Sequence, residues 1–382
     1  MLRSLVFAVP DFTPAVGGTT TQVTLLSREL ASRGHDVGVV TRRRDRSWPY
    51  SEVLDSIRVD RIGPPGRGAA AEKAAALTLA PWLARRRRGV RILQTVMWTD
   101  AVPAAAAARL LPRTIVGWGA LGDATDALGG GSSPLRRAQA RLRRRLLSRC
   151  EHVVLTPAMH DELAGLGLER CTVLPVPVDV QRFRRPSRSE RTDARASLGL
   201  ADEDVAIAYV GHLRALKRVD LLVAAVAGLA GESIPVRLVL AGGSRGAGDD
   251  VEDELREQVR ALGLDDRVVF TGVVADPRPM LWAADVFALA SEREGLPNSL
   301  LEAMACGLAC VAPASSAGDE LLGGGAGLVP ADVTGLEDAL RTLALDAELR
   351  ERLGSGAAER AAEYDVARVA DGYERLYARV AS

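Results

Sequence analysis

Two carboxylates stand on either side of a proline in a segment whose spacing suits a polar ligand. Seven residues separate Glu294 from Glu302, and Pro297 lies between them. Proline is favoured at the first position of a helix, where its missing N–H leaves no hydrogen bond unmade, so we predict a helix over 297–306. The amide groups of its first turn would be unpaired and would attract an anion such as phosphate. These amides belong to Asn298, Ser299 and Leu300.

The two carboxylates would lie at the two ends of such a ligand. Glu302 follows Asn298 by one helical turn, on the face opposite the apolar residues of the same helix. Glu294 precedes the helix, in a loop that continues through Gly295 and Leu296. Because carboxylates accept hydrogen bonds from hydroxyl groups, the pair could hold both ends of a sugar nucleotide. Without the rest of the motif, the same residues would simply be solvated charges.

A second candidate is a lysine between a predicted strand and a predicted helix. The chain has only two lysines beside 47 arginines, and Lys217 is one of them. A lysine ammonium is a compact point charge that suits phosphate. His212, Arg214 and Arg218 surround it in the same loop. We predict that this loop binds phosphate, and a solvated loop is the alternative.

A third candidate is the adjacent pair Gly17 and Gly18, which follows the first predicted strand and precedes a helix that begins near Thr19. Adjacent glycines let the backbone approach a ligand closely, and the helix N-terminus favours an anion or a sugar hydroxyl. A tight turn without a ligand is the alternative. The pattern is neither G-x-G-x-x-G nor a P-loop, which counts against dehydrogenases and NTPases.

Alternating strands and helices must position these sites. Such alternation is typical of βαβ units and parallel sheets. The predicted strands are 4–9, 36–41, 57–62, 92–96, 114–117, 152–155, 172–174, 205–210, 236–241, 268–271, 286–288 and 309–312. The predicted helices are 19–33, 69–87, 101–111, 134–149, 157–166, 218–230, 249–262, 277–283 and 297–306, followed by a mostly helical tail over 334–380.

A Pro- and Arg-rich, apolar-poor stretch over 175–201 interrupts this alternation and is the predicted linker. We therefore expect an α/β protein with two doubly wound Rossmann-like domains that face each other across a cleft. The expected domains are 1–178, on the acceptor side, and 179–364, which would bind the donor. A C-terminal helix over about 365–382 is expected to pack back on the first domain.

The charge of the chain is divided unevenly. The 382 residues carry 49 Lys+Arg and 49 Asp+Glu, but residues 1–190 hold 30 basic and 17 acidic side chains. This basic half suggests an anionic partner, either a membrane surface or an acidic acceptor. An aromatic content of 4%, without basic runs interleaved with aromatics, counts against nucleic acid. The Arg-rich segment 136–149 is either a solvated face or a docking site for anionic lipid or acceptor.

Cysteine usage and hydropathy indicate the compartment. Four scattered cysteines form neither a disulfide framework nor a metal-binding pair. No run approaches the ~18 apolar residues of a spanning helix, and the apolar run at 2–9 is interpreted as a strand rather than a secretory signal. We expect a reduced, cytoplasmic protein with peripheral contact at the inner face of the membrane if segment 136–149 docks there.

Taken together, the motifs resemble those of the family-4 retaining glycosyltransferases of the GT-B fold, over essentially the whole chain. The E-x7-E element E-G-L-P-N-S-L-L-E-A-M-A-C-G, from Glu294, is the most specific match. The Gly17-Gly18 loop, the Gly211 to Lys217 loop and the strand end at Val273 support it in order and spacing.

The resemblance implies a role for each matching residue. Glu302 would hold the ribose hydroxyls of a nucleotide-diphosphate sugar, for which UDP is the expected nucleotide, and Glu294 would contact the donor sugar. Lys217 and its neighbours His212 and Arg214 would neutralise the leaving diphosphate. The remaining donor contacts would come from backbone groups of Gly17, Gly18, Val273, Gly295, Leu296, Asn298, Ser299 and Leu300. No metal and no cofactor would be needed, because cationic side chains and helix N-termini replace Mg²⁺.

The sequence also departs from the family pattern. His212 stands where the family usually has Arg, so either Arg214 supplies the charge or His212 binds the phosphate with less charge. The N-terminal domain lacks the usual His near the reacting carbon, and Trp118 or Asp123 is the candidate acceptor-side residue. The acceptor would be a hydroxyl compound, whether a glycan, a glycolipid or a small molecule. A sugar-nucleotide epimerase and a catalytically silent sugar-nucleotide-binding protein are the alternative functions.

Overall fold

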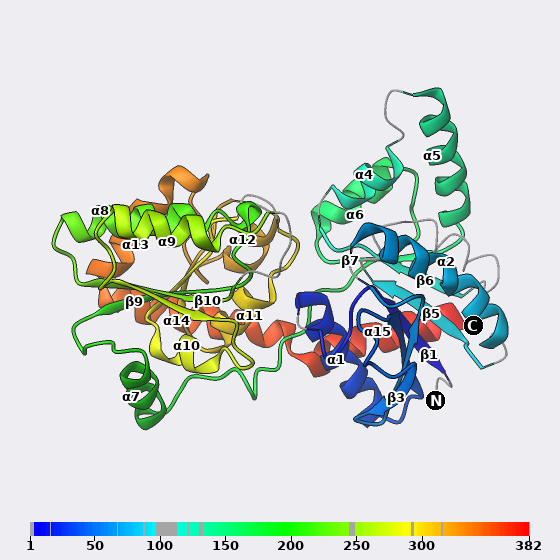
Figure 1. Ribbon diagram of the computed structural model, residues 1–382, viewed down its shortest axis with the longest axis horizontal. Helices are drawn as coiled ribbons and strands as arrows, with labels where there is room; N and C mark the ends of the chain where they lie inside the picture. The colour runs from blue at the N-terminus through cyan, green and yellow to red at the C-terminus, as the bar shows by residue number, and fades with distance from the viewer. Residues whose placement is uncertain are drawn as a thin grey trace. The chain divides into compact units, whose positions relative to one another are not determined.

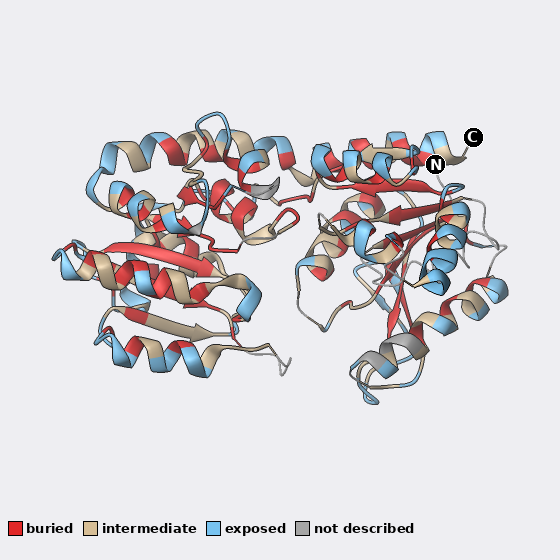
Figure 2. Cartoon of the chain, turned by 90° about the horizontal axis from the view of Figure 1, so that it is seen from above, coloured by how far each residue is buried: buried red, intermediate tan, exposed pale blue. Residues whose placement is uncertain are grey.

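The chain forms two compact units (Figure 1), which we call unit 1 and unit 2. The computed structural model describes residues 4–15, 17–66, 68–86, 89–96, 113–120, 122–129, 133–243, 249–291, 294–314 and 316–381. Unit 1 comprises Met1–Pro177 together with Val366–Ser382, and unit 2 comprises Val178–Asp365. Strands occupy the buried interior of each unit and helices cover them, with their exposed faces outward (Figure 2).

Unit 1 is built on an eight-stranded sheet in the order β3-β4-β2-β1-β5-β6-β7-β8. All neighbours are parallel except β3, which pairs antiparallel with β4 at one edge. The strands are β1 (Leu5–Val9), β2 (Val37–Arg42), β3 (Ser51–Leu54), β4 (Ile57–Ile62), β5 (Ile92–Val96), β6 (Thr114–Gly117), β7 (Glu151–Val154) and β8 (Cys171–Val173).

The described helices of unit 1 are α1 (Gly18–Ser32), α2 (Ala69–Arg86), α4 (Asp123–Leu128), α5 (Pro134–Leu147), α6 (Pro157–Gly165) and α15 (Val366–Ala381). The predicted helix over 101–111 lies outside the described residues. Within the part of the chain that the structure describes, no helix combines the length and the apolar character that a membrane crossing requires.

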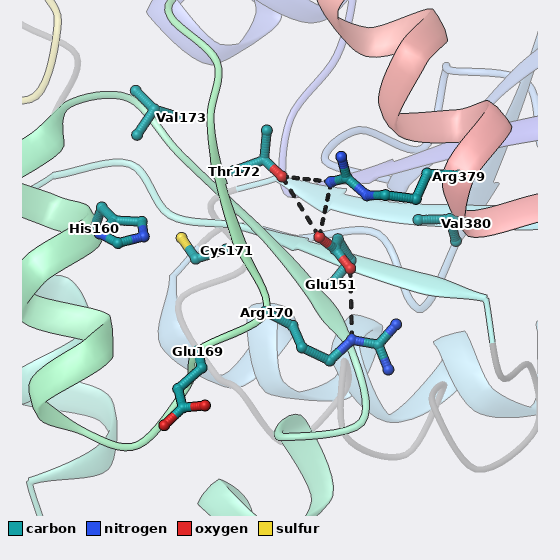
Figure 3. A pocket seen from close by; sticks show the side chains of 9 residues that line it. All are labelled: Glu151, His160, Glu169, Arg170, Cys171, Thr172, Val173, Arg379 and Val380. Carbon is teal, nitrogen blue, oxygen red and sulfur yellow. Dashed lines mark hydrogen bonds and ion pairs between the residues drawn. The ribbon is translucent and has the colours of Figure 1, made fainter.

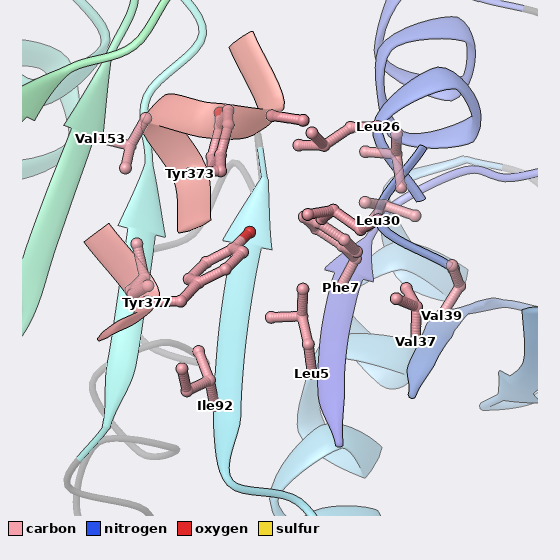
Figure 4. Close-up of a cluster of buried hydrophobic side chains, with 14 of the residues drawn as sticks. Leu5, Phe7, Leu26, Leu30, Val37, Val39, Ile92, Val153, Tyr373 and Tyr377 are labelled. Atoms are coloured by element: carbon pink, nitrogen blue, oxygen red, sulfur yellow. The ribbon is translucent and has the colours of Figure 1, made fainter. Parts of the chain in front are cut away.

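Helix α15 supplies part of the core of unit 1, although unit 2 separates it from the rest of that unit in the sequence. Tyr373 and Tyr377 pack into a cluster with Leu5, Phe7 and Ile92 from the central strands (Figure 4). Side chains beyond this apolar cluster also fasten α15. The Tyr377 hydroxyl donates to Gln94 at 2.6 Å, and Arg33 donates to Asp371 and Glu374 at 2.6 and 2.8 Å.

Unit 2 is built on a five-stranded, fully parallel sheet in the order β11-β10-β9-β12-β13. Its strands are β9 (Val205–Val210), β10 (Val236–Ala241), β11 (Val268–Gly272), β12 (Val286–Ala288) and β13 (Ala309–Val311). Its helices are α7 (Arg188–Ser197), α8 (Val219–Gly231), α9 (Glu252–Ala261), α10 (Arg278–Ala283), α11 (Asn298–Ala305), α12 (Ser316–Leu322), α13 (Leu336–Leu345) and α14 (Ala347–Ala361).

The predicted linker over 175–201 is wrong for its second half, which forms α7 and belongs to unit 2. The Ser187 side chain accepts from the Glu190 amide and the Glu190 carboxylate accepts from the Ser187 amide, so a capping box begins this helix. Arg195 is buried and donates to the Ala283 carbonyl at 3.0 Å and to Asp285 at 3.2 Å. Arginine therefore helps to attach this apolar-poor segment to the end of α10 and to the residue before β12.

Candidate active site

The order of the strands in unit 2 places two of the predicted site residues at one point. Strands β9, β10 and β11 run in sequence toward one edge, whereas β12 pairs on the other side of β9. Ligands of open α/β sheets bind beyond the carboxyl ends of the strands where the order reverses. Lys217 ends the short 3₁₀ turn Ala215–Lys217 after β9, and Glu294 follows β12. Both residues therefore belong to connections that leave this reversal point.

Lys217 and Glu294 form a close ion pair in which the ammonium donates to the carboxylate. Both side chains are largely buried, so the pair is screened only weakly by water. The phenol of Tyr209 lies under the same loop and donates to the His212 carbonyl at 2.9 Å. Burial, and then the negative charge of Glu294, raise the pKa of Tyr209 well above its usual value. The phenol is therefore a structural support for the loop.

Glycines let the loops after β9 and β10 meet closely. The Gly211 amide donates to the Ala241 carbonyl at 2.9 Å, and a Cβ at Gly242 would lie 1.7 Å from the Gly211 carbonyl oxygen. A Cβ at the next residue, Gly243, would lie 3.1 Å from Cγ2 of Val273. Val273 is 59% exposed, which is unusual for a valine at the end of a strand. The point where these loops meet is thus lined by backbone, by glycine and by the exposed side chain of Val273.

Helix α11 begins one residue later than predicted. Pro297 is its N-cap in an extended conformation, and Asn298 is the first helical residue. The Leu300 amide donates to the Pro297 carbonyl at 3.1 Å, so it is not available to a ligand as the sequence predicted. Asn298 and Ser299 are partly exposed in the first turn, whereas Gly295 and Leu296 before it are buried.

The Glu302 carboxylate has neither a hydrogen bond nor an ion pair with any described residue, and the residue is only partly exposed. Burial raises the pKa of Glu302 to about 8, Arg182 lowers it and Asp276 raises it further. The pKa of Asp276 is itself held low by hydrogen bonds from Arg278. Glu302 is therefore not a solvated helix residue. A buried carboxylate without donors is unfavourable, and hydroxyl groups of a ligand would relieve that cost.

Arg214 forms an ion pair with the carboxylate of Asp249. Its Nε atom lies 2.9 and 2.8 Å from the two Asp249 oxygens, and its Nη2 atom lies 2.7 Å from one of them. This ion pair neutralises much of the charge that Arg214 would bring to a phosphate. This ion pair weighs against the idea that Arg214 supplies the charge of the arginine that the family usually has where this chain has His212. The roles of Arg214 and His212 stay predictions.

In unit 1, Gly17 is the N-cap of α1 and Gly18 its first residue, one residue earlier than predicted. A charged cluster of Asp11, Arg42 and Arg44, which was not predicted from the sequence, lies next to this turn. Asp11 accepts from Arg42 at 2.8 Å and also from Arg44, and these hydrogen bonds outweigh burial and lower the pKa of Asp11. The run of arginines at the end of β2, which includes Arg42 and Arg44, was the signal for this cluster.

The two predicted acceptor-side residues make contacts within unit 1, and their role toward an acceptor stays a prediction. Trp118 is 8% exposed in an apolar cluster, and its indole N–H donates to Nδ1 of His152 at 3.1 Å. Nε2 of His152 then carries the proton and donates to the Leu147 carbonyl at 3.1 Å, and burial lowers the His152 pKa to about 4. Asp123 accepts from the Ala120 amide at 2.8 Å and so closes its own turn.

A separate pocket of about 670 Å³ lies in unit 1, at the sheet edge formed by β8 (Figure 3). None of its lining residues is a predicted site residue. Glu151 accepts from Arg379 at 3.0 Å and pairs with Arg170 at 3.6 Å. The lining holds two arginines and two carboxylates, Glu151 and Glu169, so its formal charges balance, and we do not assign the pocket a ligand. The described residues also contain no group of three or more His, Cys, Asp or Glu side chains placed to hold a metal ion.

Two known families match consecutive parts of the chain. Residues 16–182 match the family described as Glycosyltransferase Family 4, and residues 204–346 match the one described as Glycosyl transferases group 1. The D-inositol 3-phosphate glycosyltransferase of Kineococcus radiotolerans is 30% identical, over 95% of this chain and 90% of its own length. The mannosylfructose-phosphate synthase of Agrobacterium fabrum is 27% identical, over 76% of this chain and 70% of its own.

Solved structures of similar proteins confirm the predicted GT-B fold of two Rossmann-like domains. The sucrose-phosphate synthase of Thermosynechococcus elongatus has a TM-score of 0.82 at 22% identity, and the match covers 99% of each chain. HepE of Anabaena, solved in complex with UDP-glucose, has a TM-score of 0.77 at 20% identity and covers 98% of this chain and 99% of its own. The chain is a glycosyltransferase and belongs to glycosyltransferase family 4.

Proposed function

We propose that this glycosyltransferase moves a sugar from a UDP-sugar to a hydroxyl acceptor with retention of the anomeric configuration. The observation that carries the proposal is the Lys217–Glu294 ion pair at the strand-order reversal of unit 2. It joins a cation suited to a diphosphate and a carboxylate suited to sugar hydroxyls. HepE, with a similar fold, was solved with UDP-glucose, which supports a UDP-linked donor.

The ion pair prepares both side chains for the donor. In the unliganded protein each partner holds the other in place, so neither must be ordered when the ligand arrives. The donor diphosphate would replace Glu294 as the partner of Lys217, and Glu294 would then accept hydrogen bonds from the sugar. The ammonium would gain most when the sugar–phosphate bond breaks, because negative charge then grows on the diphosphate.

Glu302 would hold the other end of the donor. Its carboxylate is half-buried and unpartnered, and two ribose hydroxyls would supply the donors that the protein does not. The backbone around Gly243 and Val273 would receive the base. This assignment follows the unmet hydrogen-bonding capacity of Glu302.

The proposed chemistry takes place on one face of the sugar. The acceptor hydroxyl oxygen bonds to the anomeric carbon from the side of the leaving group, the bond from that carbon to the phosphate oxygen breaks, and the hydroxyl proton passes to the departing diphosphate. Lys217 and the first-turn amides of α11 would stabilise the charge, and we propose that no metal ion is needed.

The acceptor is proposed to carry a negative charge. The relatives include a D-inositol 3-phosphate glycosyltransferase and a mannosylfructose-phosphate synthase, and both names refer to a phosphorylated compound. In unit 1, Arg42 and Arg44 share the single carboxylate of Asp11 beside the α1 N-terminus, which leaves a net positive charge there. A phosphorylated polyol is therefore the first acceptor class to test.

The decisive experiment offers UDP-, GDP- and ADP-sugars with phosphorylated and unphosphorylated polyols, with and without EDTA. We expect transfer from a UDP-sugar that survives EDTA, with the product anomer identical to the donor anomer by NMR. Inversion at C2 without transfer would indicate an epimerase, and tight binding without turnover would indicate a silent binding protein. Glu302→Ala should weaken donor binding by about 1–3 kcal/mol. Glu257→Ala, at an exposed position on α9, is its control.

A further inference from the structure

Helix α5 exposes both arginine and leucine side chains to the solvent. Leu135 is 67% exposed and Leu142 is 56% exposed, and their spacing of seven residues places them on one face. The helix is attached to unit 1 through Ala140 and Leu147, which are its buried residues. Figure 1 shows α5 standing at the margin of unit 1, where it packs mainly on α4. The leucines therefore do not serve the core.

The arginines of this helix differ from most other arginines of the chain. Across both units, exposed arginines commonly have a carboxylate partner, as in Arg28–Asp55 and Arg184–Glu190. In contrast, a group of α5-segment arginines have no side-chain hydrogen bond or ion pair with any described residue. These are Arg136, Arg137, Arg141, Arg145 and Arg149. The sequence contains no acidic residue between Asp126 and Glu151 that could neutralise them locally.

The spacing of these arginines lowers the stability of the helix. Arg137, Arg141 and Arg145 follow one another at intervals of four residues, so they form a row of like charges along one side. Such neighbours destabilise a helix by a few tenths of a kcal/mol per pair. An anionic partner would remove this repulsion. Arg143 and Arg144 are partly buried, and Arg143 donates to the Ala127 carbonyl at 3.3 Å, which helps to attach the helix to unit 1.

We propose that the outer face of α5 docks on an anionic lipid bilayer. The arginine row would bind lipid phosphates, and Leu135 and Leu142 would enter the boundary between headgroups and acyl chains. This occupant accounts for both kinds of side chain. A nucleic acid would pair with the arginines but would leave two exposed leucines without a function. The inference does not depend on the proposed reaction, because it uses no residue of the donor site.

Co-sedimentation with vesicles tests the proposal. The probes are vesicles of pure phosphatidylcholine and vesicles in which about a third of the lipid is phosphatidylglycerol. We expect the protein to bind the anionic vesicles alone and to be released by salt. The triple variant Arg137→Gln, Arg141→Gln, Arg145→Gln should bind about a hundredfold more weakly, since each basic residue near an anionic surface contributes roughly a factor of five to ten.

Matched variants distinguish a specific effect of the α5 surface from the effect of the net charge of the protein. Removing three exposed arginines elsewhere, by Arg188→Gln, Arg352→Gln and Arg368→Gln, should leave vesicle binding within about twofold. Leu135→Ala with Leu142→Ala should weaken it at least fivefold. Equal binding to both kinds of vesicle, or no binding, would overturn the proposal. Vesicle binding that is unchanged in the leucine variant, together with binding to duplex DNA or heparin, would overturn the proposal and indicate a general polyanion site. UDP-sugar binding by calorimetry should be the same in every variant, which also reports that each variant is folded.

Discussion

Replacing Glu302 by glutamine should make the protein more stable at neutral and alkaline pH. Burial raises the pKa of this carboxyl from 4.5 to about 8, so the folded state holds a proton that the unfolded chain loses. Stability is therefore lost as pH rises from about 4.5 toward 8, because the unfolded state binds fewer protons in that window. Glutamine resembles the protonated carboxyl in shape and charge and removes this pH dependence.

The magnitude follows from the size of the shift. One pKa unit corresponds to about 1.4 kcal/mol. Between pH ~5, just above the pKa of the unfolded carboxyl, and pH ~7.5, close to the folded pKa, the cost grows by on the order of 3 kcal/mol. Near pH ~5 the two proteins should have similar stability. Near pH ~7.5 the Glu302→Gln protein should be the more stable one by that amount.

Urea unfolding followed by circular dichroism at a series of pH values measures this difference, provided that the slope with urea is the same for both proteins. Glu257→Gln is the matched control, since it removes the same charge from an exposed position on α9. The reasoning would be refuted by a stability difference that is constant with pH. A wild-type protein that gains stability relative to Glu302→Gln as pH rises would refute it more strongly.

Three further changes test other parts of the structure. Lys217→Ala should slow sugar transfer by ~100-fold or more while donor affinity changes much less, as steady-state kinetics and calorimetry would show. Tyr377→Phe removes the hydroxyl that donates to Gln94 at 2.6 Å, and should cost about 1–2 kcal/mol in urea unfolding. Gly242→Ala would place a Cβ 1.7 Å from the Gly211 carbonyl oxygen, so the β9 and β10 loops must separate. We expect a loss of more than ~2 kcal/mol of stability for that change, and weaker UDP-sugar binding by calorimetry.

Most of the sheet could be predicted from the sequence, because strands buried on both faces are short apolar, β-branched runs. Strand β3 was missed because it is an edge strand in which exposed and half-exposed residues alternate. Helix α7 was missed because it has few apolar residues, and the buried Arg195 contributes to its attachment by donating to the Ala283 carbonyl at the end of α10. Its capping box, Ser187 with Glu190, was present in the sequence and would have indicated its start.

The sequence indicated candidate site residues but not the contacts between them. The E-x7-E segment and Lys217 were identified from residue type and local spacing. Their pairing depends on β12 lying beside β9, because Lys217 and Glu294 are 77 positions apart in the sequence. The contact of Trp118 was not predictable for a related reason. An aromatic residue after a strand can face a ligand or the core, and only the partner His152 distinguishes the two.

The docking of α15 affects how this protein is made. Val366–Ala381 emerges from the ribosome only after all of unit 2, yet it contributes Tyr373 and Tyr377 to the core of unit 1. A nascent unit 1 must wait with an uncovered apolar surface while Val178–Asp365 is translated, on the order of ten to forty seconds at common rates of synthesis. Of the two units, the one whose synthesis starts earlier is thus the one whose core is completed later.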